Sequence, residues 1–482
     1  MKTTDLHQEA LNRARAGDTQ AALDHFAAYL ERHPDNGHAW NDAGSVLYAQ
    51  GRIDEAVRYF RRAAELTHRP PKAFGNLAMA YVATGQPHRA VQWTETLHRE
   101  GLLDATLIRQ CAQAFCAQND LASAMDVLCR GCAVLSDAAV LETQMETLRD
   151  RRAKIAFFVG GDGDTFLKDI IAYARRRYPV RIFDGKTTAD VHELMRWSDV
   201  SWFEWATNLA AEASKMPKVC RTIVRLHRYE AYECYPSQIR WDAVDTLITV
   251  GNSYVVKAMN DRVGDIAAKT SVVRIPNGVD LEAIPFTPRQ AGKNLAFVGN
   301  LRMVKNPMLL LYCMAALKAV DPEYRLFIAG RMEDPLLGQY VEHAIRSLGL
   351  NENIIYDGFQ SDIPGWLADK HIIVSTSVIE SQGMGILEAM ACGLKPAIHH
   401  FPGADETFGT QWLFSTPDDF CRLICRTDYD SESYRAFVER RYALSQQLLR
   451  INELLVTFEK YPWTPQLSVG AKRLSRLSAL AV

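Results

Sequence analysis

The chain has 482 residues, of which 48% are hydrophobic and 23% charged, and its formal net charge is −2. This length exceeds one core and predicts about three domains, while the small net charge gives no reason to expect binding to nucleic acid or to a membrane. The first residues lack the apolar segment of a signal peptide and no run reaches the ~18 apolar residues of a membrane span, so we expect a cytoplasmic protein.

The first third of the chain repeats itself with a period of 34 residues. This period is the length of the tetratricopeptide repeat, a pair of helices. The recurring glycine or asparagine fits the left-handed residue that ends a helix. The pattern predicts about four helix pairs over residues 1–136 and a capping or connecting helix over residues 137–153. Two of the recurring series are Gly17, Gly51, Gly85, Asn119 and Ala22, Ala56, Ala90, Ala124.

A solenoid of such repeats carries no chemistry but offers a concave surface to a protein partner or acceptor. The alternative is an element that only packs or joins copies of the chain as an oligomer. We expect partner or acceptor binding first and oligomerisation through the repeats second.

Cys129 and Cys132 form a C-x-x-C pair inside the repeats. A metal or redox site would need a second pair or a strand–turn–helix setting, and the sequence shows neither. We therefore interpret them as cysteines of a helix face that pack as small hydrophobic residues.

From Lys154 the pattern changes to strands alternating with helices, which predicts parallel sheets. Two Rossmann-like halves are expected, over residues 154–290 and 291–440, with a helix over 441–460 crossing back to the first half. The fold class is thus α plus α/β, a helical solenoid followed by two doubly wound domains. Ligands of such domains bind at the carboxyl ends of the strands, and we expect the site in a cleft between the halves.

The tail, residues 461–482, contains Lys472, Arg473 and Arg476 and no acidic residue. A short basic amphipathic helix on anionic lipid is one interpretation. A loosely ordered chain end is the other, and it is the one we favour.

The stretch "ESQGMGILEAMACG" follows an expected strand and places Glu380 and Glu388 eight positions apart. Gly383 and Gly385 allow close approach of a ligand, and the helix that begins here favours phosphate at its N-terminus. Because a carboxylate repels phosphate, its partners should be neutral hydroxyls, such as those of ribose. We expect one glutamate on a ribose, the other on a sugar, and the diphosphate between them.

This stretch resembles the E-x7-E motif of glycosyltransferase family 4, whose members are retaining enzymes with the GT-B fold. "IPNGVD", "FVGNLRMVKNP", "RLFIAGR" and "IIYDGF" are similar to segments of that family in the same order, and the resemblance covers roughly residues 154–460. It implies a metal-independent transfer from a nucleotide-diphosphate sugar, which is the donor substrate, with no other cofactor.

By the same resemblance, individual residues acquire expected roles. Glu388 would bind the ribose, Glu380 the donor sugar, and Lys305 and Arg302 the diphosphate. His227 would lie near the reacting carbon, although a structural role at the end of its strand is the alternative. The remaining donor-binding candidates are Gly160, Gly161, Gly299, Gly383, Met384, Gly385, Phe359 and His400.

The sequence also departs from the family pattern. Asn300 stands where the family usually has arginine, Gln382 replaces a common aromatic residue, and "HHFPGADE" replaces a glycine pair before a glutamate. Gly403 and Glu406 of this last segment are further candidates for the donor pocket. Asp162 and Asp164 form a D-x-D pair, but their place in the first loop of a GT-B-like half favours loop geometry or acceptor contact over metal binding.

In the family's mechanism, cations and helix dipoles stabilise the charge on the departing diphosphate. A solenoid joined to a glycosyltransferase resembles, in arrangement only, enzymes that glycosylate proteins. We expect a protein acceptor first and a lipid-linked or surface polysaccharide second. A catalytically silent scaffold is the third alternative.

Overall fold

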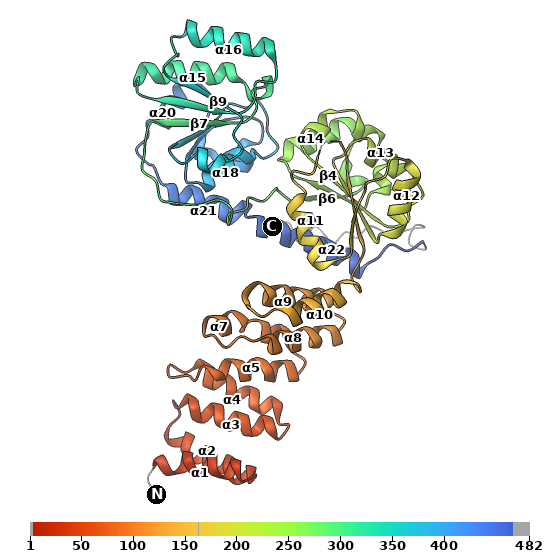
Figure 1. Ribbon diagram of the computed structural model, residues 1–482, viewed down its shortest axis with the longest axis vertical. Coiled ribbons are helices and arrows are strands. Elements are labelled where there is room, and N and C mark those ends of the chain that lie inside the picture. Colours follow the sequence, from red (N-terminus) through yellow and green to blue (C-terminus); the bar gives the residue numbers. More distant parts are fainter. Residues whose placement is uncertain (1–2, 162, 466–482) are drawn as a thin grey trace. The chain divides into compact units, whose positions relative to one another are not determined.

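The computed structural model describes residues 3–161 and 163–465, which form two compact units (Figure 1). The first unit comprises residues 1–152 and 174–179, and the second comprises residues 153–173 and 180–482. Each unit is described by itself.

The first unit is a series of antiparallel helix pairs. Its helices are α1 (Thr3–Arg15), α2 (Thr19–Arg32), α3 (Gly37–Ala49), α4 (Ile53–Glu65), α5 (Lys72–Ala83), α6 (Pro87–Val91), α7 (Thr94–Arg99), α8 (Ala105–Ala117), α9 (Leu121–Val134) and α10 (Ala139–Arg149). The residues expected to end the first helix of each pair adopt positive φ, from 59° at Asn119 to 84° at Gly17. That feature of the tetratricopeptide prediction is confirmed.

One helix differs from the expected pattern, because the second helix of the third pair is split into α6 and α7. The Thr94 hydroxyl donates to the Val91 carbonyl, at 2.8 Å. Such a bond from a side chain competes with the helical backbone pattern. It accompanies the break at Gln92 and Trp93.

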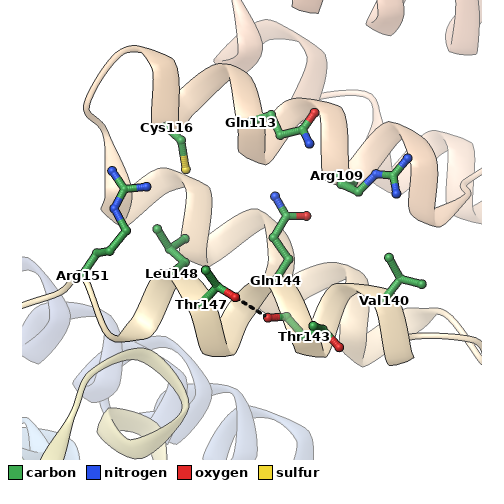
Figure 2. Close-up of a pocket in the computed structure, with 9 residues that line it drawn as sticks. All are labelled: Arg109, Gln113, Cys116, Val140, Thr143, Gln144, Thr147, Leu148 and Arg151. Carbon is green, nitrogen blue, oxygen red and sulfur yellow. Dashed lines mark hydrogen bonds between the residues drawn. The ribbon is translucent and has the colours of Figure 1, made fainter.

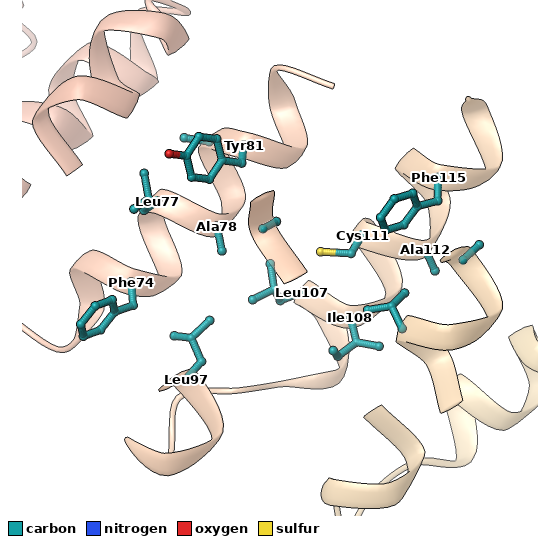
Figure 3. Packing of buried hydrophobic residues seen from close by; sticks show 14 of the residues in the cluster. Phe74, Leu77, Ala78, Tyr81, Leu97, Leu107, Ile108, Cys111, Ala112 and Phe115 are labelled. Carbon is teal, nitrogen blue, oxygen red and sulfur yellow. The ribbon is translucent and has the colours of Figure 1, made fainter. Parts of the chain in front are cut away.

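The core of this unit is built from apolar side chains that the 34-residue period brings together (Figure 3). The side chains of Phe74, Leu77, Leu97, Ile108 and Phe115 are all at most 5% exposed. Cys129 is part of the same core and Cys132 packs against it, as expected of helix-face cysteines.

The second unit contains two parallel six-stranded sheets. The first has the order β2-β1-β3-β4-β5-β6, and its strands are β1 (Ile155–Val159), β2 (Val180–Ile182), β3 (Val200–Glu204), β4 (Arg221–Leu226), β5 (Thr246–Thr249) and β6 (Ser271–Arg274). Its helices include α11 (Lys168–Arg177), α12 (Thr188–Trp197), α13 (Asn208–Lys215) and α14 (Ser253–Val263).

The second sheet has the order β12-β11-β10-β7-β8-β9. Its strands are β7 (Asn294–Val298), β8 (Arg325–Ala329), β9 (Ile354–Gly358), β10 (Ile372–Ser375), β11 (Lys395–His399) and β12 (Leu413–Phe414). Its helices are α15 (Pro307–Val320), α16 (Pro335–Ser347), α17 (Ile363–Trp366), α18 (Met384–Ala391), α19 (Ala404–Phe408), α20 (Pro417–Ile424) and α21 (Ser431–Tyr442).

The segment 303–320 meets the length and composition of a membrane span, which the sequence analysis did not expect. The structure gives this apolarity another reason. Leu310, Met314 and Leu317 of α15 are at most 1% exposed and belong to the core of the second sheet. A helix buried in a protein core passes the same test of composition.

The helix expected over 441–460 is α22 (Leu444–Lys460), and Ala443 separates it from α21. Ala443 is extended and forms a bridge with Val279, which explains the break. At its far end α22 reaches the first sheet, where Glu459 accepts from the Ala153 backbone at 3.0 Å and Arg221 donates to the Tyr461 carbonyl. The basic residues Lys472, Arg473 and Arg476 lie outside the described residues.

A pair of matched glycines tests how tightly the repeat helices pack. A Cβ atom at Gly44 would lie 2.8 Å from the ring of Phe60, whereas at Gly75 it would meet only Leu97, at 3.9 Å. We expect Gly44→Ala to lower the free energy of unfolding by about 1–2 kcal/mol through overpacking. Gly75→Ala should leave it unchanged or raise it by up to about 1 kcal/mol through helix propensity. Urea unfolding followed by circular dichroism measures both, and equal effects would contradict the packing argument.

Candidate functional site

The E-x7-E stretch lies where the strand order of the second sheet reverses. β7 and β10 are neighbours in this sheet, and the chain continues outward from them in opposite directions. Such a switch point leaves a crevice at the carboxyl ends of the two strands, and ligands of doubly wound sheets bind there. The loop with Gly299 follows β7, and the loop with Glu380 follows β10.

Lys305 and Glu380 are brought together in this crevice as a partly buried ion pair. The Ser377 hydroxyl also donates to Glu380 Oε1, at 2.7 Å. The backbone of Lys305 is held in turn by the Thr376 hydroxyl, which donates to its carbonyl at 2.8 Å. The carboxylate and the ammonium expected to contact the donor therefore neutralise each other in this structure.

Helix α18 begins at Gly383, whose φ of +77° is the left-handed conformation that favours glycine. Gly383 supplies no side-chain cap. Within the described residues, no acceptor is assigned to the backbone N–H groups of Met384 and Gly385. Unbound N–H groups at the start of a helix, together with the helix dipole, form a site for an anion.

Gly385 also lies against the neighbouring strand β7. A Cβ atom there would lie 3.1 Å from Val298 Cγ1, which leaves little room for a larger residue. Gly299 directly follows β7, and its backbone lies close to Gly330. A Cβ atom at Gly330 would lie 2.1 Å from the Gly299 carbonyl oxygen. Glycines thus keep the backbone of the crevice close packed.

Glu388 lies one turn into α18 and accepts no hydrogen bond from the described residues. Burial raises the pKa of its carboxyl group above the ordinary value, with no compensating charge. A half-buried carboxylate without a partner is unfavourable in the protein alone. It is the arrangement expected of a group that accepts hydroxyl hydrogen bonds from a ligand.

Arg302 does not face the Lys305 site as a free cation, because Glu333 binds it. Arg302 donates to Glu333 Oε1 at 2.8 Å, and Asn300 donates to the same oxygen at 2.5 Å. Glu333 was not singled out from the sequence. Its charge offsets the positive charge that Arg302 was expected to bring to a diphosphate.

The remaining candidates of this half lie at its surface. Phe359 follows β9, is 60% exposed, and has the Arg331 guanidinium 4.7 Å from its ring centroid. His400 is exposed after β11, whereas the preceding His399 has Nδ1 3.0 Å from the Ser377 carbonyl. An exposed ring with a cation beside it offers a stacking surface for a nucleobase.

The segment "PGADE" is used in contacts between the two sheets' domains. Glu406 accepts from the Ser253 backbone, at 3.0 Å, and pairs with Arg274, at 3.3 Å. An added Cβ at Gly403 would lie 2.4 Å from Asn252 Cγ, so only glycine fits there. Both residues therefore hold the start of α14 against the second sheet's domain.

The first sheet has its own switch point between β1 and β3, and a cavity of about 570 Å³ lies there. It is lined by residues that follow three strands: Gly160 and Gly161 after β1, Thr207 and Asn208 after β3, and Tyr229 and Glu233 after β4. The structure thus places the glycine loop beside a cavity of mixed polar and aromatic character. This composition suits a small polar ligand.

Of the two aspartates of the D-x-D pair, Asp162 lies outside the described residues. Asp164 is exposed and lies 3.8 Å from Lys168. Among the residues that the structure describes, no group of three or more histidine, cysteine or acidic side chains is arranged to hold a metal ion.

His227 ends β4 and is only 5% exposed. Its Nε2 lies 2.8 Å from Glu204 Oε1, and its ring packs between Trp205 and Phe166, with centroid distances of 4.2 and 5.2 Å. Burial lowers the pKa of His227 despite the neighbouring carboxylate. A neutral ring that donates from Nε2 leaves Nδ1 as an acceptor for a hydroxyl.

Trp205 has φ of +77°, which is rare for a bulky residue. In this conformation its indole N–H donates to the Gly163 carbonyl, at 3.0 Å, while its ring packs on His227. The strained residue therefore joins the glycine loop to the histidine. Backbone strain of this kind is characteristic of functional sites.

Glu204 is part of a buried network that sequence reasoning missed. Arg225 and Glu204 are both fully buried and pair at 2.7 Å, and the Trp202 indole donates to the other carboxylate oxygen at 2.9 Å. Burial alone would raise the pKa of Glu204, but the charge of Arg225 and the bond from His227 hold it below its ordinary value. Glu204 is therefore ionised.

The network continues from Arg225 to the E-x7-E loop. Arg225 donates to the Asn277 side chain, and Asn277 exchanges two hydrogen bonds with Gln382. The Gln382 side chain accepts from the Asn277 backbone N–H and donates to its carbonyl, each at 2.7 Å. Gln382, which replaces a common aromatic residue, thus joins the donor loop to the segment between the sheets.

Glu230 completes the polar cluster below His227. Its Oε1 accepts from the backbone N–H groups of His227 and Ala206, at 3.1 and 3.3 Å, while its buried Oε2 has no partner. Burial raises the pKa of Glu230 to about 7. Two neighbouring carboxyl groups, Glu204 and Glu230, thus differ in charge near neutral pH.

Replacement of Glu388 separates stability from ligand binding. The pKa of Glu388 is higher in the folded protein than in the unfolded chain, where it is near 4.5. Ionisation of Glu388 therefore destabilises the fold as the pH rises above 4.5. We expect Glu388→Gln to raise Tm by roughly 1–3 °C at pH 7.5. The gain should vanish near pH 4, where the wild-type group is protonated. Differential scanning fluorimetry from pH 4 to 8 measures this, and a lower Tm at pH 7.5 would refute it.

The buried pair is tested by a double-mutant cycle. Glu204→Gln leaves the Arg225 charge without a counter-ion, and we expect the free energy of unfolding to fall by about 3–5 kcal/mol. Glu204→Gln combined with Arg225→Met removes both charges and should recover part of that loss. Urea unfolding of the four proteins gives the coupling. Strictly additive losses would show that the pair does not act as a unit.

Comparison with known proteins agrees with this geometry. Residues 285–434 match the family model of glycosyl transferases group 1, and residues 7–71 match a tetratricopeptide repeat model. The first range contains Lys305, Glu380 and Glu388.

Two curated relatives share part of the chain. Glycosyltransferase 1 domain-containing protein 1 of Xenopus tropicalis is 30% identical over 150 residues, which are 30% of this chain and 43% of that protein. The lipopolysaccharide core biosynthesis mannosyltransferase LpsB of Rhizobium meliloti is 26% identical over 161 residues, which are 30% and 46% of the two chains. The chain thus spans less than half the length of these relatives.

Among solved structures, HepE of Anabaena, crystallised with UDP and glucose, is similar with a TM-score of 0.52 and 18% identity. The match covers 63% of this chain and 100% of that one, and it shows the fold alone. Two Rossmann-like domains after a helical solenoid are therefore confirmed. The chain carries tetratricopeptide repeats followed by a GT-B fold with a glycosyl transferase group 1 domain.

Proposed function

We propose that this protein is a glycosyltransferase that moves a sugar from a nucleotide-diphosphate sugar to an acceptor. The observation that carries the proposal is the unpartnered, half-buried carboxylate of Glu388, one turn below the uncapped N-terminus of α18. The helix start suits phosphate, and the carboxylate suits ribose hydroxyls. One ligand that carries both phosphate and ribose hydroxyls is a nucleoside diphosphate.

Donor binding would rearrange the Lys305–Glu380 pair. Lys305 exchanges its carboxylate partner for a phosphate oxygen, and Glu380 then accepts from hydroxyls of the sugar. Ser377 keeps Glu380 oriented through its bond of 2.7 Å. As the glycosyl–phosphate bond breaks, charge develops on the leaving diphosphate, and Lys305 and the α18 N–H groups stabilise it.

On the acceptor side, His227 lies two residues before Tyr229, which lines the cavity of the first sheet. A neutral imidazole whose Nε2–H is fixed by Glu204 accepts a hydrogen bond from a hydroxyl and orients it. In the proposed retaining reaction the departing phosphate, not a protein carboxylate, takes the acceptor's proton. The same pathway needs no metal ion.

A protein bound by the repeats is the acceptor we propose first. The support is the solenoid itself, since stacked helix pairs provide an extended surface for a polypeptide. The second candidate is a lipid-linked or surface polysaccharide, favoured by the likeness to a lipopolysaccharide mannosyltransferase. A silent scaffold, the third alternative, gives no reason for the unpartnered carboxylate of Glu388.

The donor site is tested by nucleotide-induced stabilisation. UDP, GDP, ADP and their sugars are screened for a rise in Tm, because a ligand that binds only the folded state stabilises it. One nucleotide class should raise Tm of the wild-type protein, and Glu388→Gln and Lys305→Met should each abolish the shift. Arg325→Met, at an exposed position at the start of β8, is the control that should keep it.

With the active donor identified, transfer and hydrolysis are followed by release of the nucleoside diphosphate in the presence and absence of a chelator. Retention is read from the anomeric configuration of the product by NMR. A folded wild-type protein that responds to none of the nucleotides would overturn the proposal.

A further inference from the structure

A second groove, in the repeat unit, has the composition of a peptide-binding site. It lies between α8 and α10 and encloses about 550 Å³ (Figure 2). Arg109 and Gln113 line it from α8, and Val140, Gln144 and Leu148 from α10, with Arg151 directly after that helix. By the 34-residue period, α10 corresponds to the first helix of a further pair, as α8 is the first helix of the fourth pair. The groove therefore lies between the first helices of two successive repeats.

The charged side chains that line the groove are all positive. Arg109 and Arg151 are its charged residues, and no aspartate or glutamate lines it. Both arginines are exposed, and neither forms an ion pair with a described residue. Asp120, which follows α8 and caps α9 through Ser123, does not line the groove. The groove therefore attracts negative charge.

The floor of the groove holds an unused acceptor. Gln144 rises from α10 into the space between the helices (Figure 2), and its buried Oε1 has no hydrogen-bond partner. Gln110, one repeat earlier, also has a buried Oε1 without a partner. Buried amide oxygens without partners are rare, and a backbone N–H of an extended peptide in the groove would satisfy that of Gln144.

The two arginines lie at opposite ends of the groove, Arg109 near Val140 and Arg151 near Cys116 (Figure 2). Arg109 and Cys116 are separated by two helical turns, which is roughly 10 Å along α8. An extended peptide rises ~3.3 Å per residue. Because successive side chains of an extended peptide alternate between its two faces, two carboxylates four positions apart lie on one face and would reach both guanidinium groups.

We propose that this groove binds an extended acidic peptide with two Asp or Glu residues four positions apart. Each carboxylate pairs with one arginine, the backbone between them donates to Gln144, and an apolar side chain packs on Val140 and Leu148. The inference rests on the proposed function only in assigning this peptide to the acceptor or a partner of the enzyme. The binding itself requires no donor.

The test begins with a random nine-residue peptide library displayed on phage and selected against the full chain. Enriched sequences should carry two acidic residues at the stated spacing. Synthetic fluorescein-labelled copies, and analogues with Asn or Gln in place of the acids, are then measured by fluorescence anisotropy. Each acid replaced should weaken binding about 10-fold, because charge-assisted hydrogen bonds are the strong ones, and added salt should weaken it further.

Matched variants locate the binding. Arg109→Glu with Arg151→Glu should abolish it, whereas Arg62→Glu with Arg130→Glu makes the same change of net charge at exposed positions outside the groove and should preserve it. Gln144→Leu removes the unused acceptor and should weaken binding several-fold without lowering Tm. If Gln144 only stabilised the fold, the same substitution would lower Tm and leave peptide binding unchanged.

Three results would overturn the inference. The first is enrichment of peptides without the acidic pair, and the second is equal binding by the groove variant. The third is arginine-dependent binding of dextran sulfate or of phosphatidylglycerol vesicles with no binding of acidic peptides. Nucleotide-induced stabilisation is measured on the same proteins, so a failure of the donor site is recognised separately from a failure of the groove.

Discussion

The fully buried charge of Arg225 is the constraint on which the first sheet's site depends. An isolated guanidinium in a protein interior is very unfavourable, so Glu204 must be ionised beside it. That requirement fixes more than one salt bridge. The carboxylate also receives the His227 Nε2–H and the Trp202 indole, and Arg225 continues to the Asn277 side chain. One buried charge thus orients the histidine, the end of β3 and the segment that joins the sheets.

The same network gives the E-x7-E loop a link to the first sheet. Asn277 and Gln382 exchange two bonds of 2.7 Å, and both are at most 5% exposed. An aromatic residue at position 382 could pack there but could not pair with both backbone groups of Asn277. Glutamine at position 382 therefore makes this contact directional. Sites held by directional bonds keep their geometry within tight limits.

The fold was predictable from the sequence because its signals are periodic. Spacing of 34 residues located the helix pairs, and apolar runs before glycine-rich loops located the strands and hence the switch points. Glu380, Glu388 and Lys305 followed from their places after those strands. Glu333 did not, because its contact with Arg302 joins two loops 31 positions apart and neither loop carries a pattern. Glu204 and Arg225 look like ordinary strand residues in the sequence. Only the pairing of β3 with β4 shows that they lie side by side.

The positions at which helices break could not be predicted from the sequence either. Ala443 is a good helix former, yet it is extended because it bridges Val279 from another part of the chain. Tertiary pairing overrides a local preference of less than about 1 kcal/mol per residue. The same reasoning explains the groove of the repeat unit. Period and composition place Arg109, Gln144 and Arg151 on helices, but only the packing of α10 beside α8 puts them around one space.

The joining of repeats and a GT-B fold in one chain has a consequence for the proposed transfer that needs no fixed arrangement of the two units. A segment held in the groove is tethered to the same polypeptide as the donor site, so its encounter with that site becomes intramolecular. Short tethers give effective concentrations of up to the millimolar range. A weakly held acidic segment would then suffice to select an acceptor. Weak binding also allows the segment to dissociate after the proposed transfer. An exposed groove with two separate arginines suits such weak binding.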